Sequence, residues 1–314
     1  MRKIFTLVVV LVALISGVSA QQDPQFSQNM FTKQIVNPGY AGSNDAICGT
    51  LLYRDQWDGF PGDPKTLLFS ADAQIDEISG GVGLNIMSDQ LGLQKQLDIK
   101  VGYAYRMALG DGKLGIGADI GFVQNSLTGV FLYNDPHDPS IPAQAGMPFS
   151  YSGTAPDFDF GVYYNTTDYY VGLSTTHLAA SSIKYGNVTS SLAHHYYFMG
   201  GYKFPVSEMI ELEPSTLIKS DASSTQLDIN LRAIYNNTFW GGLSYRLQDA
   251  IVVMVGFQKD GFKVGYSYDL TTSDIKSYSR GSHEIMLSYC FKPTSKPKKI
   301  TTHENVRTLG GKER

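Results

Sequence analysis

Residues 96–107 read QLDIKVGYAYRM, and their side chains alternate between apolar and polar along the stretch. Leu97 and Ile99 fall on one face, whereas Asp98 and Lys100 fall on the other. Successive side chains of a β-strand point to opposite faces, so this stretch predicts a strand with one oily face and one charged face.

The same alternation recurs between residues 46 and 291, where it marks fourteen candidate strands. Short turns and longer loops alternate between them, except that two of the expected external loops, near 220–224 and 248–250, are short. An even strand number with that loop pattern is typical of barrels in the bacterial outer membrane. We therefore expect an all-β fold, a transmembrane antiparallel up-and-down β-barrel of about 14 strands, with lipid outside and a polar lumen inside. A secreted β-sandwich with Tyr-rich strands is the alternative. The candidate strands lie near residues 47–54, 66–75, 80–88, 96–107, 113–124, 157–164, 169–176, 195–204, 210–219, 225–235, 239–247, 251–258, 262–270 and 283–291.

The first twenty residues predict an export signal. Arg2 and Lys3 precede an apolar run, and Val18-Ser19-Ala20 fits cleavage after Ala20. The protein is expected to be integral to the cell outer membrane, with both termini in the periplasm. Its expected parts are a signal peptide at 1–20, a non-strand periplasmic or plug segment at 21–46, the barrel at 47–291 and a basic periplasmic tail at 292–314.

Charge is distributed unevenly along the chain. There are 25 basic and 29 acidic residues in all, but the tail from Lys292 onward has seven basic residues and two acidic ones. The body, residues 21–291, then has 16 basic residues against 27 acidic ones, which argues against nucleic acid as a partner. A basic tail behind an acidic body predicts either a docking tail or a solvated end.

The pattern also predicts local features of three strands. Pro214 interrupts the candidate strand at 210–219, so we expect a bulge there. Residues 251–255 are apolar on both faces, so side chains or a plug should fill the lumen beside them. Gly115 and Gly117 lie inside a strand with no helix after them, and we interpret them as lumen-side packing positions.

The residues show no catalytic constellation. The sequence has no His-Glu-x-x-His, Gly-x-Ser-x-Gly or phosphate-binding motif, and its Ser, Asp and His residues are not grouped. His194-His195 is the only histidine pair, and adjacent strand residues point to opposite faces. We interpret the two as exposed loop-end side chains, and we expect no enzyme activity, no cofactor and no metal.

The two cysteines fall at the two ends of the predicted barrel. Cys48 lies near the start of the first strand and Cys290 near the end of the last, and barrel closure makes these strands neighbours. Parity places both side chains on the lumen face. Because the periplasm is oxidising, a disulfide across the closing seam is one reading, and two buried free thiols are the other.

Three ordered motifs in the first 75 residues of the chain resemble a known family. They are Asp23-Pro24-Gln25-Phe26-Ser27-Gln28, then Asn37-Pro38-Gly39-Tyr40-Ala41-Gly42, then Tyr53-Arg54-Asp55-Gln56-Trp57 with a Gly/Pro-rich turn ending Pro64-Lys65-Thr66. In this order they resemble the PorP/SprF family, with Gly39 in place of the commoner Ala. Length and strand count extend the resemblance over the mature chain.

The resemblance implies an outer-membrane component of the type IX secretion system of Bacteroidetes, which exports proteins and in some species supports gliding. It also implies outer-membrane lipid around the barrel, periplasmic and lipoprotein components as partners, and a secreted surface adhesin as a client. The motif residues become candidates for binding a partner or closing the barrel mouth: Asp23, Pro24, Phe26, Ser27, Gln28, Asn37, Pro38, Arg54, Gln56, Trp57, Phe60, Pro64 and Lys65.

The first external loop has its own reading from its residues. Trp57, Phe60 and the prolines make it stiff and aromatic. Arg54 and Lys65 flank the loop, and we expect them to pair with lumen carboxylates such as Asp72. The loop either folds into the mouth and closes it or contacts the client directly.

Two other functions compete with secretion. An outer-membrane transport barrel for small hydrophobic or polar solutes predicts solute flux through the lumen. A lipid-modifying enzyme needs a Ser/His/Asp group at the barrel rim, and the sequence shows none. Co-purification of an adhesin or a periplasmic lipoprotein complex from detergent would separate secretion from transport.

Overall fold

The computed structural model describes residues 23–130, 148–186 and 188–292. The expected signal peptide and the basic tail beyond Lys292 lie outside these residues. In the part of the chain that the structure describes, no helix is both long enough and apolar enough to cross a membrane.

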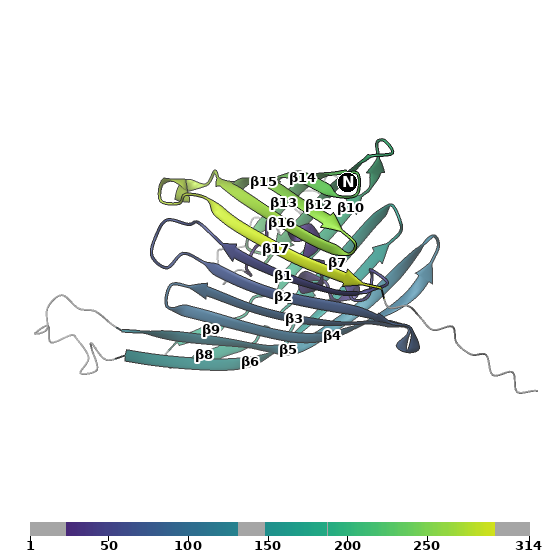
Figure 1. Ribbon diagram of the computed structural model, residues 1–314. Helices are drawn as coiled ribbons and strands as arrows, with labels where there is room; N and C mark the ends of the chain where they lie inside the picture. The colour runs from purple at the N-terminus through teal and green to yellow at the C-terminus, as the bar shows by residue number, and fades with distance from the viewer. Residues whose placement is uncertain (1–22, 131–147, 187, 293–314) are drawn as a thin grey trace, which may run out of the picture.

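Fourteen strands form one closed antiparallel barrel, as predicted (Figure 1). Strands that follow one another around the wall are hydrogen-bonded, and pairing of β1 with β17 completes the ring. A two-residue strand, β11 (Phe204–Pro205), extends the turn before β12, and a separate hairpin joins β8 (Ser182–Tyr185) to β9 (Val188–Ser191). The barrel strands are β1 (Ile47–Asp55), β2 (Lys65–Ile75), β3 (Gly80–Leu91), β4 (Gln94–Leu109), β5 (Gly112–Val130), β6 (Pro148–Asn165), β7 (Tyr169–Thr176), β10 (His195–Tyr202), β12 (Ile210–Ser220), β13 (Thr225–Tyr235), β14 (Phe239–Arg246), β15 (Ala250–Lys259), β16 (Phe262–Thr271) and β17 (Ser282–Phe291).

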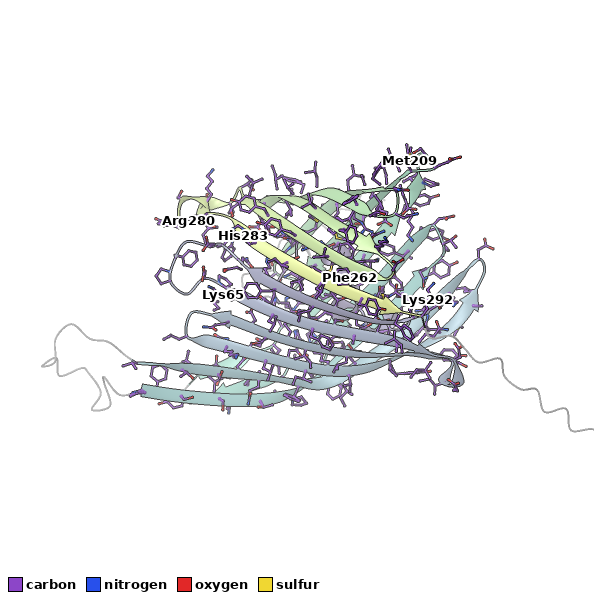
Figure 2. All side chains as sticks on the ribbon, in the orientation of Figure 1. Lys65, Met209, Phe262, Arg280, His283 and Lys292 are labelled. Carbon is purple, nitrogen blue, oxygen red and sulfur yellow. A yellow bond between two sulfur atoms is a disulfide. The ribbon has the colours of Figure 1, made fainter. Side chains whose placement is uncertain are left out.

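The barrel has two rims, which we name from the course of the chain. The tail rim is the end where β1 begins and β17 ends, and the loop rim is the opposite end. Figure 2 labels Met209 and Lys292 at the tail rim, and Lys65 and Arg280 at the loop rim. Two short 3₁₀ turns, η3 (Asp76–Ile78) and η4 (Asp274–Ser277), lie in connections at the tail rim and the loop rim respectively.

Every predicted strand is confirmed, and the largest difference lies in β5 and β6. We expected a loop over 125–156, but β5 continues to Val130 and β6 already begins at Pro148. These strands pair without a break along their whole length, from Val130 opposite Pro148 down to Lys113 opposite Asn165. Ser, Thr and Gly residues extend the ladder here because strand pairing satisfies their backbone groups, a constraint that alternation of side chains does not reveal.

The expected external loop 177–194 also contains structure, the β8–β9 hairpin. Its Ile183 and Tyr185 are buried against Val123 and Ala155 of the long β5–β6 pair. This small apolar cluster gives the extension beyond the main rim a core of its own, which explains why the loop folds back onto the wall.

The predicted bulge at Pro214 is wrong. Residues 210–220 of β12 pair one to one with β13, with Pro214 opposite Leu231. On the other side, pairing with β10 runs only as far as Ser215 and resumes with β11 at Leu212. Proline has no N–H to donate, so β12 keeps its register and loses ladder bonds only toward β10.

The two faces of the wall differ as the alternation predicts. On β13, Leu231 is 48% exposed on the outer face, whereas Asp228 is 1% exposed on the lumen side. A charge on the lipid face would cost about 2–4 kcal/mol at mid-bilayer. The lumen beside residues 251–255 is filled with side chains, as expected, because Val252 and Met254 pack with Phe26 in an apolar cluster.

Candidate functional site in the barrel lumen

Residues 23–46 lie inside the barrel and run along the lumen from one rim toward the other; we name this segment the plug. Asp23 contacts His177, which follows β7 on the loop-rim side, with 2.8 Å between Oδ1 and Nε2. Asp45 accepts a hydrogen bond from Lys113 Nζ at 2.7 Å, beside the tail rim. The plug contains only the short elements η1 (Asn29–Phe31), α2 (Lys33–Val36) and η2 (Pro38–Tyr40).

The two ends of the described chain therefore lie toward opposite rims, with Asp23 on the loop-rim side and Phe291 at the tail rim. The expectation that both termini lie in the periplasm concerns residues outside the described ones. The plug threads the lumen lengthwise before β1 starts at the tail rim.

A group of buried charges, the central charge cluster, holds the first part of the plug. Ser27 Oγ donates to the Asp269 carboxylate at 2.7 Å and accepts from Arg54 Nη1 at 2.8 Å. The backbone N–H groups of Ser27 and Gln28 donate to Glu284 at 2.9 and 2.7 Å. The motifs that contain Ser27 and Arg54 thus contact carboxylates of β16 and β17, which lie more than 200 residues later in the chain. The cluster consists of Arg54, Arg246, Asp228, Asp269 and Glu284.

Arg54 joins the plug to the barrel wall through two carboxylates. Its Nη2 lies 2.8 Å from Asp269 and its Nη1 lies 3.1 Å from Glu284, and its side chain is 1% exposed. Arg54 therefore pairs with lumen carboxylates, as expected, although Asp72 is not one of them, because Asp72 accepts the N–H of Gly42 at 3.0 Å. The expectation is wrong for Lys65, whose exposed ammonium lies 3.5–3.6 Å from two rim carboxylates, those of Asp63 and Asp55.

The motif loop between β1 and β2 meets the start of the plug at the loop rim. Gln56, Trp57 and Pro64 line a cavity of about 470 Å³ together with Asp23 and Pro24. The loop is hydrogen-bonded to the start of β17, where the Trp57 N–H donates to Ser282 Oγ at 3.0 Å. Phe60 is half-buried elsewhere in the loop, and neither it nor Lys65 lines this cavity.

Toward the tail rim, the plug packs directly against the backbone of the barrel wall in β5 and β6, with no side chain between them. Asn37 Nδ2 donates to the carbonyl of Val162 at 3.1 Å, and Asn37 Oδ1 accepts the Gly39 N–H at 2.9 Å. A Cβ on Gly39 would lie 2.9 Å from the Gly115 carbonyl oxygen, and one on Gly117 would lie 2.5 Å from the carbonyl carbon of Pro38. This confirms Gly115 and Gly117 as lumen-side packing positions. It also explains why glycine suits position 39 in this chain.

Replacing Gly117 by valine is expected to displace the plug from this wall, because real side chains do not approach backbone so closely. Overpacking of this kind costs roughly 1–3 kcal/mol. Faster cleavage of the plug by added protease in detergent, with the barrel still folded, is the expected result. Gly49→Val is the matched control, since a Cβ there meets nothing within 4 Å. Equal cleavage of the two variants would contradict the close fit.

A second polar cluster surrounds Asp23. The Tyr197 hydroxyl donates to Asp23 at 2.9 Å, and His177 Nδ1 lies 2.7 Å from Asp157. Burial alone would lower the pKa of His177, but the carboxylates of Asp23 and Asp157 outweigh it and raise that pKa to about 10. Likewise, burial opposes ionisation of Asp23, yet His177 and His195 hold the pKa of Asp23 well below its usual range. The interpretation of His195 as an exposed loop-end side chain is wrong, because it is 1% exposed.

These side chains are also the described residues best placed to hold a metal. Asp23, His177 and His195 can bring ligand atoms within 4.8 Å of one another, and so can Asp157, Asp159 and His177. In the structure, both ring nitrogens of His177 already contact carboxylates, those of Asp157 and Asp23. Lys100 Nζ already lies 2.7 Å from Asp157 and 2.8 Å from Asp159. The arrangement acts as a neutralised ion network that anchors Asp23.

Cys48 and Cys290 face each other directly across the β1–β17 seam. They are register partners, their Cα atoms lie 4.1 Å apart, and the structure joins their sulfur atoms. Both side chains line the lumen at the tail rim, as parity predicts. Of the two readings that the sequence leaves open, the structure contains the disulfide.

Several solved structures are similar to this chain at low identity, and three of them serve as examples. A Pseudomonas aeruginosa FadL homologue is 12% identical, covers 82% of this chain and 92% of its own, and gives a TM-score of 0.47. The Ralstonia pickettii toluene transporter TbuX is 11% identical with 82% and 92% covered and a TM-score of 0.49. The Pseudomonas putida toluene transporter TodX is 11% identical with 87% and 96% covered and a TM-score of 0.48. At this level of similarity they carry no argument about function.

The comparison with protein families is more specific. No curated protein matches the chain. The family described as type IX secretion system membrane protein PorP/SprF matches residues 18–289, which include the whole plug and nearly all of the barrel. All the motif residues fall inside that match, from Asp23 to Lys65. The chain therefore belongs to the PorP/SprF family of type IX secretion system membrane proteins.

Proposed function

We propose that this secretion-system protein is a sealed docking platform in the outer membrane rather than a solute channel. The observation that carries the proposal is the plug, which occupies the lumen and is held there by buried polar contacts. Ser27 bonds to Asp269 at 2.7 Å, and the Gln28 N–H bonds to Glu284 at 2.7 Å. Breaking such contacts leaves buried charges unpaired, so the plug favours a closed lumen in the resting protein.

The proposed orientation places the tail rim in the periplasm and the loop rim at the cell surface. Turns at the tail rim are short, such as residues 110–111 between β4 and β5, and outer-membrane barrels keep their short turns in the periplasm. The basic tail follows Phe291 at that rim. Periplasmic and lipoprotein components would then meet the tail rim. A secreted adhesin would be exported or attached at the loop rim, which would also link the protein to gliding motility.

Two measurements on the purified protein test the platform against a transport barrel. The full chain is extracted in mild detergent, and co-purifying proteins are identified. The same preparation is then inserted in a planar bilayer to measure conductance and solute flux. We expect a secreted adhesin or a periplasmic lipoprotein complex to co-purify, with little conductance. A conducting barrel that binds no protein would instead mark a transporter of small hydrophobic or polar solutes.

Deleting residues 293–314 is expected to leave the barrel inserted but to weaken recruitment of periplasmic partners. The deletion removes six basic residues and two acidic ones, so electrostatic attraction to an acidic partner would fall. Recovery of each partner in the detergent extract is the measurement, with heat-modified gel mobility as the check on barrel folding. Unchanged recruitment and secretion would show that the tail is a solvated end.

A further inference from the structure

A cavity of about 270 Å³ opens between the plug and the wall at the tail rim, and four basic side chains line it. We name these four residues the cationic cup. They come from separate parts of the fold, namely the plug, the turn after β10, strand β13 and strand β16. In chain order they are Lys33, Lys203, Arg232 and Lys263.

The cup is short of negative partners. Among the described residues, the only cup member in an ion pair is Arg232, whose Nη2 meets Glu213. Lys33 Nζ instead lies over the Tyr170 ring, 3.6 Å from its centroid. Of the other carboxylates along the cavity, Asp72 already accepts the Gly42 N–H, and Asp168 is exposed in the turn between β6 and β7.

Arg232 shows most clearly that an acceptor is missing. It is only 8% exposed, and its guanidinium is held 4.7 Å over the Phe31 ring. Its Nε and Nη1 atoms are buried without a hydrogen-bond partner among the described residues. A buried donor without a hydrogen-bond acceptor costs about 1–3 kcal/mol, and the cost is larger when the donor is charged. Each of these two free N–H groups can donate to one carboxylate oxygen, and hydrogen bonds from a guanidinium to a carboxylate are among the strong ones, so the free donors point to that class of ligand.

The charge state of Lys33 reflects the same shortage. Burial lowers its pKa to about 7, and although Glu213 opposes the shift, Arg232 and the other cup lysines add to it. A negative ligand in the cavity would remove much of this penalty, because Glu213 is the one carboxylate of the described residues that is ion-paired with the cup.

We propose that the cationic cup binds acidic side chains from a segment of a partner polypeptide that enters the lumen at the tail rim. Lipid is a poorer occupant, because the barrel wall separates the cup from the acyl chains. The chain's own tail is excluded by charge, since it is basic like the cup. The proposal rests on the proposed function for placing the tail rim in the periplasm, where such a partner would be found.

Hexaglutamate peptide is the probe, titrated calorimetrically into the full mature chain in a nonionic detergent. We expect saturable one-site binding that weakens at least tenfold in Lys33→Gln and in Arg232→Gln. Among the described residues Lys33 has no ion-pair partner, so replacing it leaves no buried carboxylate unpaired, and it lies in the plug rather than in the wall. Its variant therefore keeps the test valid if Arg232→Gln folds poorly. Lys65→Gln, which removes an exposed lysine at the other rim, should bind like the parent.

Two further arms separate the alternatives. Binding should be tighter at pH 6 than at pH 8, because Lys33 is protonated below its pKa of about 7 while glutamate stays ionised over that range. No side chain that faces Lys33 has an ordinary pKa between 6 and 8; these are Tyr40, Tyr170, Lys203, Glu213, Arg232 and Lys263.

Equal affinity of parent and Lys33→Gln for the peptide, or no binding at all, would overturn the cup. Inorganic phosphate that binds as tightly as the peptide would show a small-anion site and overturn the polypeptide ligand. Either failure leaves the co-purification result untouched, so the secretion role and the cup stand or fall separately.

Discussion

Replacing Arg54 by methionine is expected to lower the free energy of unfolding by about 3–5 kcal/mol. Removal of one partner from a buried ion pair leaves the other charges uncompensated in a low dielectric. Here the guanidinium lies 2.8 Å from Asp269 and 3.1 Å from Glu284, and all three side chains are 2% exposed or less. Methionine keeps much of the volume of the arginine side chain, so the loss of stability measures the missing charge rather than a new cavity.

The measurement is guanidinium-induced unfolding in detergent, followed by tryptophan fluorescence and by heat-modified gel mobility. Lys65→Met is the matched control, because it removes the other cation of the same motif. Its ammonium is exposed and lies 3.5–3.6 Å from its carboxylates, so its loss should leave the unfolding midpoint unchanged. Equal midpoints for both variants would mean that the central charge cluster does not stabilise the fold.

The strands could be predicted from the sequence because a lipid-facing barrel needs the same alternation in every strand. Leu231 outside and Asp228 inside follow from parity alone. Parity fixes the face of a residue but not its partner. Arg54 meets Asp269 and Glu284 rather than Asp72 because barrel closure places β17 beside β1 and β16 next to β17.

The plug itself is the part that periodicity does not describe. Residues 23–46 have no repeating pattern, and their structure is set by the lumen that surrounds them. Gly115 and Gly117 gave a usable signal, since glycine on a lumen face makes room for backbone. His195 gave none, because the sequence does not show that Asp23, at the loop-rim end of the plug, lies against it. Likewise, nothing in the sequence places Lys33 beside Arg232.

Removing the disulfide is the second change with a large expected effect. In Cys48→Ser/Cys290→Ser, we expect the free energy of unfolding to fall by about 2–5 kcal/mol. The bond closes a loop with a sequence separation of 242 residues, so it restricts nearly the whole unfolded chain. The chain-entropy model assigns about 5 kcal/mol to a loop of this length, which is the upper end of that range.

Three comparisons isolate the bond from its neighbours in the seam. Thr50→Val removes the hydroxyl contact to Ser288 at 3.0 Å, two residues along the same strand pair, and should cost about 1 kcal/mol. Dithiothreitol should lower the stability of the parent to that of the double variant and leave the double variant unchanged. Under denaturing, non-reducing conditions the parent should resist alkylation, and two alkylated cysteines would disprove the bond.

The seam is the position in this fold where a disulfide should stabilise the protein most. Every other strand pair in the wall joins strands close in sequence, whereas β1 and β17 are the first and last barrel strands. The contacts between β1 and β17 must offset the entropic cost of closing a loop as long as the whole barrel, whereas those of a hairpin offset only the cost of closing a short turn. A covalent link there fixes the least local strand pairing of the wall. We therefore expect the double variant to unfold faster. In hydrogen exchange, the backbone amides of β1 and β17 should lose protection before those of the other strands. Uniform loss of protection around the ring would contradict this.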